Sequence, residues 1–265
     1  MIRKHTAPRA LLLAAALASL AAAPLAAQGT LPPAQQLLDR YAQAVGGRDR
    51  VARYTSVRTV SDLEFMGMGI KGTVESYTAK PNRMFMKTEL GPAGTGTMGF
   101  DGAVGWTNSA MQGPALMEGA ELEQRREESD FLESAAMIAD PAAYASIQTV
   151  ERAEMGGKAC WKVKLVRKSG RESFNCYDVE TGLLAGIVRT QVTQMGNMEI
   201  TSVVGDYKDF GGVLLPTRST ATAAGQPVVI VTTTRSVEFD TAQPSVFELP
   251  QEIRALVAGA RKPAS

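Results

Sequence analysis

The sequence predicts a mainly β protein of the α+β type, in which an antiparallel sheet forms an incomplete barrel and helices cover its open side. About a dozen segments alternate polar and apolar residues and are separated by Gly, Pro or Asn, which is typical of strands joined by short turns. Only a few segments have helical spacing. A sheet with so many strands curls, because each strand is twisted relative to its neighbour.

Residues 1–27 have the features of a cleavable export signal. A basic stretch precedes an apolar run from Ala10 to Ala23, and small residues stand before the expected cleavage site at Gln28. No other apolar run approaches the roughly 20 residues that a membrane-spanning helix requires. We therefore expect residues 28–265 to form a single soluble domain in the periplasm.

The charge of the expected mature chain excludes several functions. Removing residues 1–27 takes away three of the 28 basic residues, no acidic residue and the single histidine, so 25 basic and 27 acidic residues remain. Without a basic excess we expect no nucleic-acid partner. Without histidine, the chain lacks a Ser-His-Asp triad and any zinc or haem site that uses histidine. We expect no metal, no cofactor and no catalytic residue.

The elements of the first half follow in order along the chain. A helix is predicted over residues 32–45, because Leu37, Leu38 and Tyr41 recur at helical spacing and two glycines end the pattern. A short helical turn is expected at residues 49–53. The period then changes to two, which predicts strands at residues 55–66, 68–79, 83–90, 96–100 and 103–108.

A long, highly charged helix is predicted over residues 118–139. Acidic residues open it, where the helix dipole favours them, and Asp140 with Pro141 ends it. Arg125 and Arg126 lie three or four residues from several acids, so we expect a solvated face with local ion pairs. Further strands are predicted at residues 146–154, 159–167, 172–179, 183–193, 197–208, 213–223 and 227–239, and a last helix at residues 251–258.

Two glycine-rich segments, residues 67–72 and 94–99, match the spacing of a dinucleotide-binding loop. Such a loop needs a helix directly after it, so that the helix N-terminus faces the pyrophosphate. Both segments lead instead into residues typical of strands. We therefore interpret their glycines as parts of turns and bulges.

Cys160 and Cys176 flank a predicted hairpin whose turn contains Gly170. In an oxidising compartment, two cysteines on adjacent strands favour a cross-strand disulfide over a catalytic pair. Two free, buried thiols are the alternative, because a bulge at Gly170 would shift the register of the hairpin.

Methionines supply the main indication of a ligand site. Met66 and Met68 are in phase with Ile70, and Met84 shares a strand face with Met86. Methionine side chains adapt to flexible apolar ligands, but they also fill irregular gaps in a core. The binding interpretation gains weight if the sheet is concave and few helices are available to cover it.

Four motifs occur in a defined order over nearly the whole expected mature chain. They are Phe100-Asp101-Gly102 with Gly105-Trp106, the segment Asp178 to Leu184, the segment Asp206 to Thr217, and Phe247 before Pro250. In this order they resemble the outer-membrane lipoprotein-sorting proteins of the LolA-like superfamily. Each motif alone is mostly turn chemistry, so the resemblance depends on their order and spacing together with the leading helix.

The resemblance implies an unclosed antiparallel barrel of about eleven strands, with helices lining its opening, that shields acyl chains or hydrophobic peptides in the periplasm. It implies an acylated lipoprotein or a lipid as ligand. An inner-membrane release complex and an outer-membrane acceptor are further implied partners, and we expect the protein to be a monomer. The family includes lipoprotein carriers, lipid transporters and stress sensors that regulate a membrane-bound anti-sigma factor.

We predict a non-enzymatic binding protein with a concave apolar cavity. The residues predicted to line this cavity are Met66, Met68, Ile70, Met84, Met86, Met98, Phe100 and Trp106, and those predicted to form a lid are Phe131, Leu132 and Ile138. One alternative is a sensor or adaptor that docks a segment of a membrane protein through the charged helix. Another is a carboxylate-based hydrolase, which needs two acids facing one pocket.

Overall fold

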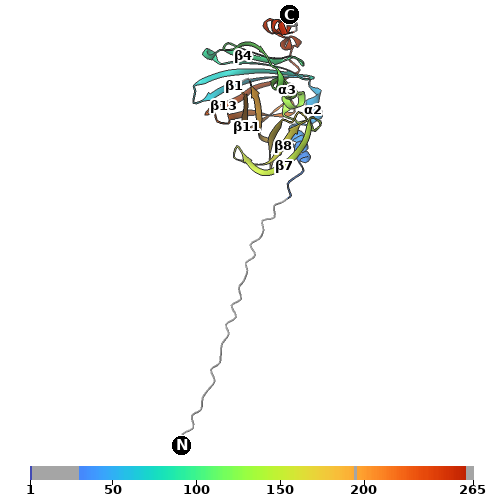
Figure 1. The fold of residues 1–265 in the computed structure, drawn as a ribbon. Helices are drawn as coiled ribbons and strands as arrows, with labels where there is room; N and C mark the ends of the chain where they lie inside the picture. Colours follow the sequence, from blue (N-terminus) through green and yellow to red (C-terminus); the bar gives the residue numbers. More distant parts are fainter. Residues whose placement is uncertain (2–29, 194–195, 261–265) are drawn as a thin grey trace. The chain divides into compact units, whose positions relative to one another are not determined.

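One antiparallel sheet is the framework of the protein (Figure 1). The computed structural model describes residues 1, 30–193 and 196–260, so the predicted leader lies outside the described residues except for Met1. Within the described residues the strands are β1 (Ser56–Met66), β2 (Ile70–Ala79), β3 (Arg83–Glu89), β4 (Thr95–Phe100), β5 (Gly105–Ser109), β6 (Gly113–Leu116), β7 (Tyr144–Met155), β8 (Lys158–Arg167), β9 (Glu172–Asp178), β10 (Leu184–Thr193), β11 (Gly196–Phe210), β12 (Val213–Ala223) and β13 (Val229–Phe239).

Five α-helices and three short 3-10 helices accompany the sheet within the described residues. The α-helices are α1 (Ala34–Ala44), α2 (Arg48–Arg53), α3 (Gly119–Glu128), α4 (Phe131–Ala136) and α5 (Gln251–Ala260), and the 3-10 helices are η1 (Gly91–Ala93), η2 (Pro141–Ala143) and η3 (Pro244–Phe247). None of the described helices is long and apolar enough to cross a membrane.

The sheet does not close into a complete barrel. Its strands lie in the order β6, β5, β4, β3, β2, β1, β13, β12, β11, β10, β9, β8, β7, and the edge strands β6 and β7 do not pair with each other. Helix α3 contacts both β5 and β10, so it bridges two distant parts of the sheet. This arrangement confirms the predicted incomplete antiparallel barrel with helices on its open side, with thirteen strands rather than about eleven.

The two faces of the sheet differ in charge around β1, β2 and β13. One face carries ion pairs, such as Arg58 to Glu75 at 2.6 Å and Arg58 to Glu238 at 3.1 Å, and we name it the outer face. The opposite face, which we name the inner face, holds uncharged residues throughout β1 to β5, as the strand register shows. Water therefore solvates the outer face around the ion pairs of β1, β2 and β13, whereas the inner face of β1 to β5 suits a ligand or a core without charge.

The main hydrophobic core fills only one half of the open barrel. Leu37, Leu38 and Tyr41 of α1 pack there with residues of α2, α4 and β7 to β12, which confirms the predicted helix and its apolar face. The hydroxyl of Tyr41 donates a hydrogen bond of 2.9 Å to the carbonyl of Ala136, which joins α1 to α4. On the inner face of β1 to β5, only Val57 belongs to this core cluster. The main core thus does not extend over the rest of the inner face of β1 to β5, although Phe100 on that face is fully buried.

Glycine at position 46 allows α1 to end close to the sheet. Gly46 has a φ of 113°, and a Cβ atom built there would lie 2.3 Å from the carbonyl oxygen of Gly212. Only a residue without a side chain fits this backbone conformation and this close approach. The predicted end of the helix at the two glycines is therefore correct.

The predicted single helix over residues 118–139 is wrong, because two helices occupy this segment. Helix α3 ends at Ser129, whose hydroxyl donates a hydrogen bond to the carbonyl of Arg125. Asp130 then has a non-helical backbone conformation, and its side chain accepts a hydrogen bond from the backbone N–H of Glu133 as the N-cap of α4. A left-handed residue, Met137, ends α4 before the predicted stop.

The remaining sequence predictions of strands are confirmed, with one omission. Strand β6 escaped prediction because it has four residues and contains Pro114, which is tolerated there since β6 is an edge strand. Segments 67–72 and 94–99 lead into β2 and β4 and open no helix. Their glycines at positions 67, 69 and 94 have positive φ, which confirms that these glycines form turns.

The predicted disulfide between Cys160 and Cys176 is confirmed. The cysteines lie on the paired strands β8 and β9, with their Cα atoms 5.4 Å apart. Both are fully buried with Ala185 in a small cluster that is separate from the main core. The disulfide therefore joins two strands on the opposite side of the sheet from Asn175 and Tyr177, which alternate with Cys176 along β9.

Candidate functional site

A cavity of about 290 Å³ lies between α3 and the inner face of β3 to β5, and we name it the methionine cavity. Met86, Met98 and Thr107 line it from the sheet, and Glu121 lines it from α3. Met86 pairs with Met98 and Met98 pairs with Thr107, so the three side chains stand side by side on one face. All three are half-buried, so the main core does not cover them.

Strand parity separates the residues that we predicted to line an apolar cavity. Met84, Met86, Met98 and Phe100 share the inner face, because Met84 pairs with Phe100 and Met86 with Met98. Ile70 has the same parity as Val74, which pairs with Thr88 on that face. Of this group, Met86 and Met98 line the methionine cavity, whereas Phe100 is fully buried.

Three members of the predicted set lie outside the methionine cavity and away from the inner face, which corrects the prediction. Met66 alternates with Phe65 and falls on the outer face, where 47% of its surface is exposed. Met68 lies in the turn between β1 and β2 and is 53% exposed. Trp106 pairs with Gly99 on the outer face and contacts the ring of Phe85. A shift of one residue along a strand reverses its face, and the sequence alone did not determine that phase.

The three predicted lid residues have another role in the structure. Phe131 and Ile138 are fully buried in the main core, and Leu132 packs against that core. They fix α4 on the sheet, and α4 instead presents Glu133 and Met137 to a second cavity. The helix that borders both cavities is α3, which the predicted lid did not include.

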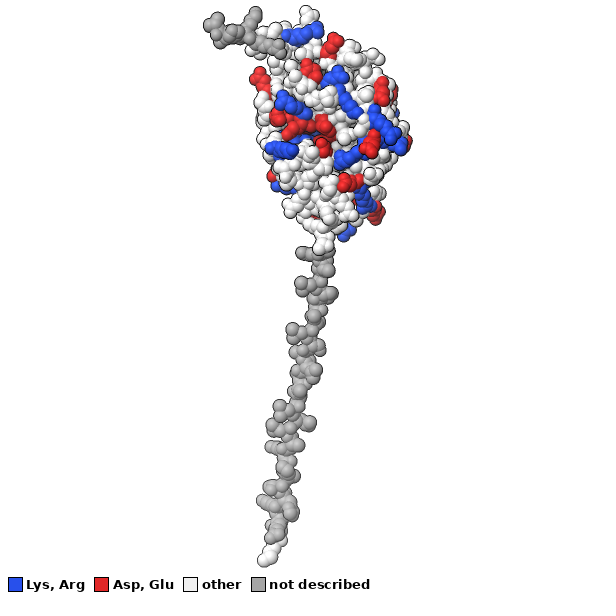
Figure 2. All heavy atoms as spheres, turned by 90° about the vertical axis from the view of Figure 1, so that its right-hand side faces the viewer, with Lys and Arg blue, Asp and Glu red and all other residues white. Residues whose placement is uncertain are grey.

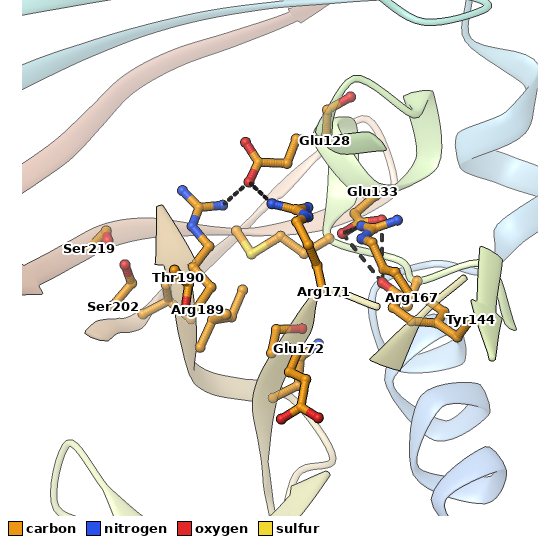
Figure 3. A pocket seen from close by; sticks show the side chains of 17 residues that line it. Glu128, Glu133, Tyr144, Arg167, Arg171, Glu172, Arg189, Thr190, Ser202 and Ser219 are labelled. Carbon is orange, nitrogen blue, oxygen red and sulfur yellow. Dashed lines mark hydrogen bonds and ion pairs between the residues drawn. The ribbon is translucent and has the colours of Figure 1, made fainter. Parts of the chain in front are cut away.

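The second cavity, of about 310 Å³, is lined by charged residues, and we name it the arginine cavity (Figure 3). Arg171 follows β8, and Arg189 comes from β10. Their guanidinium groups both point toward Glu128 of α3, with N–O distances of 3.6 Å and 3.8 Å. Beside them, Arg167 of β8 contacts Glu133 of α4 at 2.5 Å.

These ion pairs form one connected network between the helices and the sheet. Arg171 also contacts Glu127 at 2.6 Å, and Arg167 contacts the same carboxylate at 3.7 Å. Arg125 approaches Glu128 at 3.7 Å from within α3. The network thus holds four arginines and three glutamates, so its formal charge is +1. It tethers α3 and α4 to the sheet from several sides.

Burial and charge act in opposite directions on Glu128 and Glu133, two of the three glutamates that line the arginine cavity. Burial raises the pKa of Glu133 above its ordinary value, although Arg167 opposes the shift. Burial also opposes the ionisation of Glu128, but Arg189, Gln124, Arg125 and Arg171 outweigh it and lower the pKa of that carboxyl. Glu128 is therefore the firmly ionised acceptor at the centre of the arginines.

The predicted solvated face of the charged helix is correct only in part. Arg126 and Glu123 pair at 2.9 Å on the exposed side of α3, as expected for local ion pairs. Acidic and basic side chains are intermixed on the face of the molecule that Figure 2 shows. Glu127 and Glu128, however, are mostly buried and pair with arginines of the sheet. Sequence reasoning missed these partners because they lie 40 or more residues away along the chain.

Gln124 also anchors α3 to β10, and no pattern in the sequence predicted this contact. Its side chain is 1% exposed, and its Oε1 atom accepts a hydrogen bond of 2.7 Å from the backbone N–H of Val192. Its Nε2 atom donates to the carbonyl of Thr190 at 3.3 Å and to Glu128 at 2.7 Å. Strand β9 stops pairing with β10 at Arg189, so the amide of Gln124 bonds backbone groups beyond the last pair.

We expect Gln124→Ala to loosen α3 over the cavities without unfolding the protein. The backbone N–H of Val192 loses its acceptor, so its hydrogen exchange rate should rise by about tenfold or more. Hydrogen exchange followed by mass spectrometry measures this change. Gln148→Ala, an exposed site on β7, is the matched control and should leave exchange in β10 unchanged. Unaltered exchange at Val192 in the Gln124 variant would contradict this anchoring role.

Three acids, Glu128, Glu133 and Glu172, line the arginine cavity, and the hydrolase alternative requires two acids that face one pocket. Glu128 and Glu133 both face it, and their pKa values are shifted in opposite directions. Each carboxylate, however, already accepts contacts from arginines that hold α3 or α4 to the sheet. Within the described residues, no three His, Cys, Asp or Glu side chains meet to hold a metal. The arrangement thus gives both glutamates a tethering role.

The open barrel with a helix bridging it defines a class of fold that solved structures share. A LolA superfamily protein from Nitrosomonas europaea matches with a TM-score of 0.53 and 12% identity, over 82% of this chain and 98% of that chain. A DUF1329 family protein from Desulfovibrio piger matches with a TM-score of 0.53 and 11% identity, over 82% and 97%. No protein-family model and no curated sequence matches the chain. The chain therefore has the LolA-like fold that its motifs predicted.

Proposed function

We propose that the protein is a periplasmic, non-enzymatic binding protein that carries or senses a lipid or a lipoprotein. The observation that carries this proposal is the uncharged inner face of β1 to β5, where the main core reaches only Val57 and which α3 borders at the methionine cavity. An apolar surface left uncovered inside a fold is typical of a binding site. The chain shares its fold with a LolA superfamily protein, and the resemblance of its motifs to the lipoprotein-sorting proteins implies the same class of ligand.

Acyl chains suit the methionine cavity because burial of apolar surface alone supplies the affinity. Each methylene group that leaves water contributes about 0.8 kcal/mol. Met86 and Met98 are flexible and polarisable, so they adapt to a chain that takes several conformations. The outer face, with its ion pairs, offers no comparable surface around Arg58 and Asp62.

The proposed partners follow from the same class of function. The ligand is an acylated lipoprotein or a lipid, delivered by an inner-membrane release complex and passed to an outer-membrane acceptor in lipoprotein sorting. Residues 28–265 would act as a single exported domain after removal of the leader. A carrier must lose its ligand to a tighter acceptor or through opening of its helices, and α3 is the element placed to open.

We expect Met86→Asp to weaken the binding of a fluorescent fatty acid by about tenfold or more. A carboxylate at this position would have to lose water against the acyl chain, and no cation lines the methionine cavity to compensate it. Met66→Asp, the same substitution on the exposed outer face, is the matched control and should bind as the unaltered protein does. Equal affinity of the two variants, both folded by circular dichroism, would remove Met86 from the binding site.

Native mass spectrometry of the protein purified gently from a periplasmic extract tests the proposed function directly. A stoichiometric lipid or acylated peptide, identified after organic extraction, would support the carrier or lipid sensor. An apo mass that persists after incubation with lipids would contradict it.

The sensor or adaptor alternative has one supporting observation, the exposed charged side of α3. Glu123 and Arg126 pair there, away from the cavities. A membrane protein segment that docks on this side would be retrieved by pull-down whether or not lipid is bound. Charge reversal at both positions should then abolish the interaction while lipid binding persists.

A further inference from the structure

Glu121 is the only charged residue that lines the methionine cavity within the described part of the chain. It lies half-buried in the first turn of α3, where the helix dipole favours a carboxylate. Arg125, one turn later, is attracted to Glu121, but Arg125 does not line the cavity and its ion pair is with Glu128 at 3.7 Å. Among the described residues no cation forms an ion pair with Glu121. The cavity thus presents one carboxylate without a bonded counter-ion.

The sheet side of the methionine cavity contains two neighbouring rows of side chains on the inner face. In one row Met86 pairs with Met98, and in the next row Thr88 pairs with Gly96, which pairs in turn with Ser109. A Cβ atom built on Gly96 would meet no atom within 4 Å beyond its chain neighbours, so the space above this residue is open. The cavity therefore places a row with hydroxyl groups beside a row of methionines.

An ammonium group matches the acceptors of this cavity. It carries a positive charge and three N–H donors, whereas the Glu121 carboxylate and the hydroxyl oxygens of Thr88 and Ser109 accept hydrogen bonds. Attraction between opposite charges is stronger in a partly enclosed apolar cavity than in bulk water, because less water screens it. An anionic group would be repelled by Glu121 for the same reason. The cavity therefore favours a cationic head group over an anionic one.

We propose that the methionine cavity binds a single-chain amphiphile whose head group carries a primary ammonium, with the ammonium at Glu121 and the alkyl chain against Met86 and Met98. The proposal rests on the proposed function and narrows its ligand from any lipid or lipoprotein to this class. A volume of about 290 Å³ is at the low end of small-molecule sites, so it suits one chain better than several.

Binding of three amphiphiles with the same tail tests the ammonium site. Dodecylamine, dodecanol and dodecanoate are compared by calorimetry near neutral pH, where the amine is protonated, with ethylamine as a head group without a long tail. We expect the amine to bind about tenfold tighter than the alcohol, because a hydrogen bond to a charged group contributes a factor of that order. The acid should bind more weakly than the alcohol, because Glu121 repels its carboxylate.

Substitutions on α3 assign this preference to Glu121. Glu121→Gln should lower the ratio of amine to alcohol affinity by about tenfold, because it removes the charge and keeps the shape of the side chain. Glu121→Asp keeps the charge and should retain part of the preference, whereas Glu121→Lys should make the acid bind more tightly than the amine. Glu123→Gln is the matched control on the same helix. Glu123 pairs with Arg126 on the exposed side, so this variant should keep the preference for the amine.

Several outcomes would overturn the proposal, and they are distinguishable from failure of the proposed function. Equal binding of amine and alcohol by the unaltered protein would remove the ammonium site but keep the lipid-binding function. An equal loss of all three ligands in Glu121→Gln would assign Glu121 to holding α3 rather than to the ligand. Ethylamine that binds as tightly as dodecylamine would indicate a site for small free amines. Absence of binding by all three amphiphiles would contradict the proposed function itself.

Discussion

Arg167→Met is expected to lower the free energy of unfolding by about 3 kcal/mol. The Arg167 side chain is 8% exposed and contacts Glu133 at 2.5 Å and Glu127 at 3.7 Å. Its guanidinium group also lies over the ring of Tyr144, 4.9 Å from the ring centre. Methionine fills much of the space but leaves the Glu133 carboxylate without its cation. Urea unfolding of the two proteins at neutral pH measures the difference.

Arg126→Met is the matched control for this substitution. Arg126 pairs with Glu123 at 2.9 Å, but both side chains are about half exposed, so removing the pair should cost less than about 1 kcal/mol. The double variant Arg167→Met with Glu133→Gln should regain part of the lost stability, because it removes the unpaired charge. Equal losses from Arg167→Met and Arg126→Met would contradict the tethering role of the buried pair.

The pH dependence of the Arg167 variant has a defined sign. A carboxyl group whose pKa is raised in the folded state, as in Glu133, favours folding at low pH, and this contribution is lost as the pH rises through the raised value. Loss of Arg167 raises this pKa further. The stability deficit of Arg167→Met should therefore be smaller near about pH 5 than near about pH 8. A deficit that grows on acidification would contradict this assignment.

Removal of the disulfide by Cys160→Ala with Cys176→Ala is expected to cost about 3 kcal/mol. The two cysteines are 16 residues apart in sequence, and a loop of this size restricts the unfolded chain by that order. Loss of the two buried sulfur atoms adds a smaller packing cost, because both side chains are fully buried. Thermal unfolding of the variant and of the unaltered protein, with and without a reducing agent, measures the effect.

The reduced protein separates the two causes. If restriction of the unfolded chain dominates, the unaltered protein under reducing conditions should unfold close to the double alanine variant. Stability that is the same in all three samples would show that the disulfide contributes nothing. Cys160 and Cys176 face away from the arginine cavity, so amphiphile binding at a temperature where the variant is folded should not change.

The two predictions concern opposite sides of one sheet. Arg167 acts on the inner side, where helices meet strands, and its loss should affect both stability and the position of α4 above the arginine cavity. The disulfide acts on the other side and joins only β8 to β9. Comparison of ligand affinities in these two variants therefore distinguishes general loss of stability from loss of the helix tethers.

Local patterns were sufficient to predict most elements of the fold. The period of two identified the strands because each turn between them carries glycine, proline or asparagine. The apolar spacing of Leu37, Leu38 and Tyr41 predicted α1 and its buried face correctly. These features depend on neighbouring residues, which is why the sequence is a reliable guide to them. The break between α3 and α4 was missed because Ser129 and Asp130 sit within a run of helix formers.

From the sequence, the candidate site could be predicted only as an apolar surface formed by strand residues, without the face that each residue takes. The sequence indicated that methionines on strands would line an apolar cavity, and Met86 and Met98 do so. It did not determine which face Met66 and Trp106 would take, because a single register position decides the face of each side chain.

The sequence by itself was enough to predict an open antiparallel barrel with few helices and an export signal before it, and it favoured a cross-strand disulfide over two free thiols. Only the tertiary structure decided that Arg171 and Arg189 meet Glu128. It also decided that Gln124 bonds backbone groups of β10 beyond the last residue that pairs with β9. The physical reason is that these contacts join residues more than 40 positions apart, whose meeting depends on the curvature of the whole sheet. A charged helix face looks the same in sequence whether water or a guanidinium group lies opposite it.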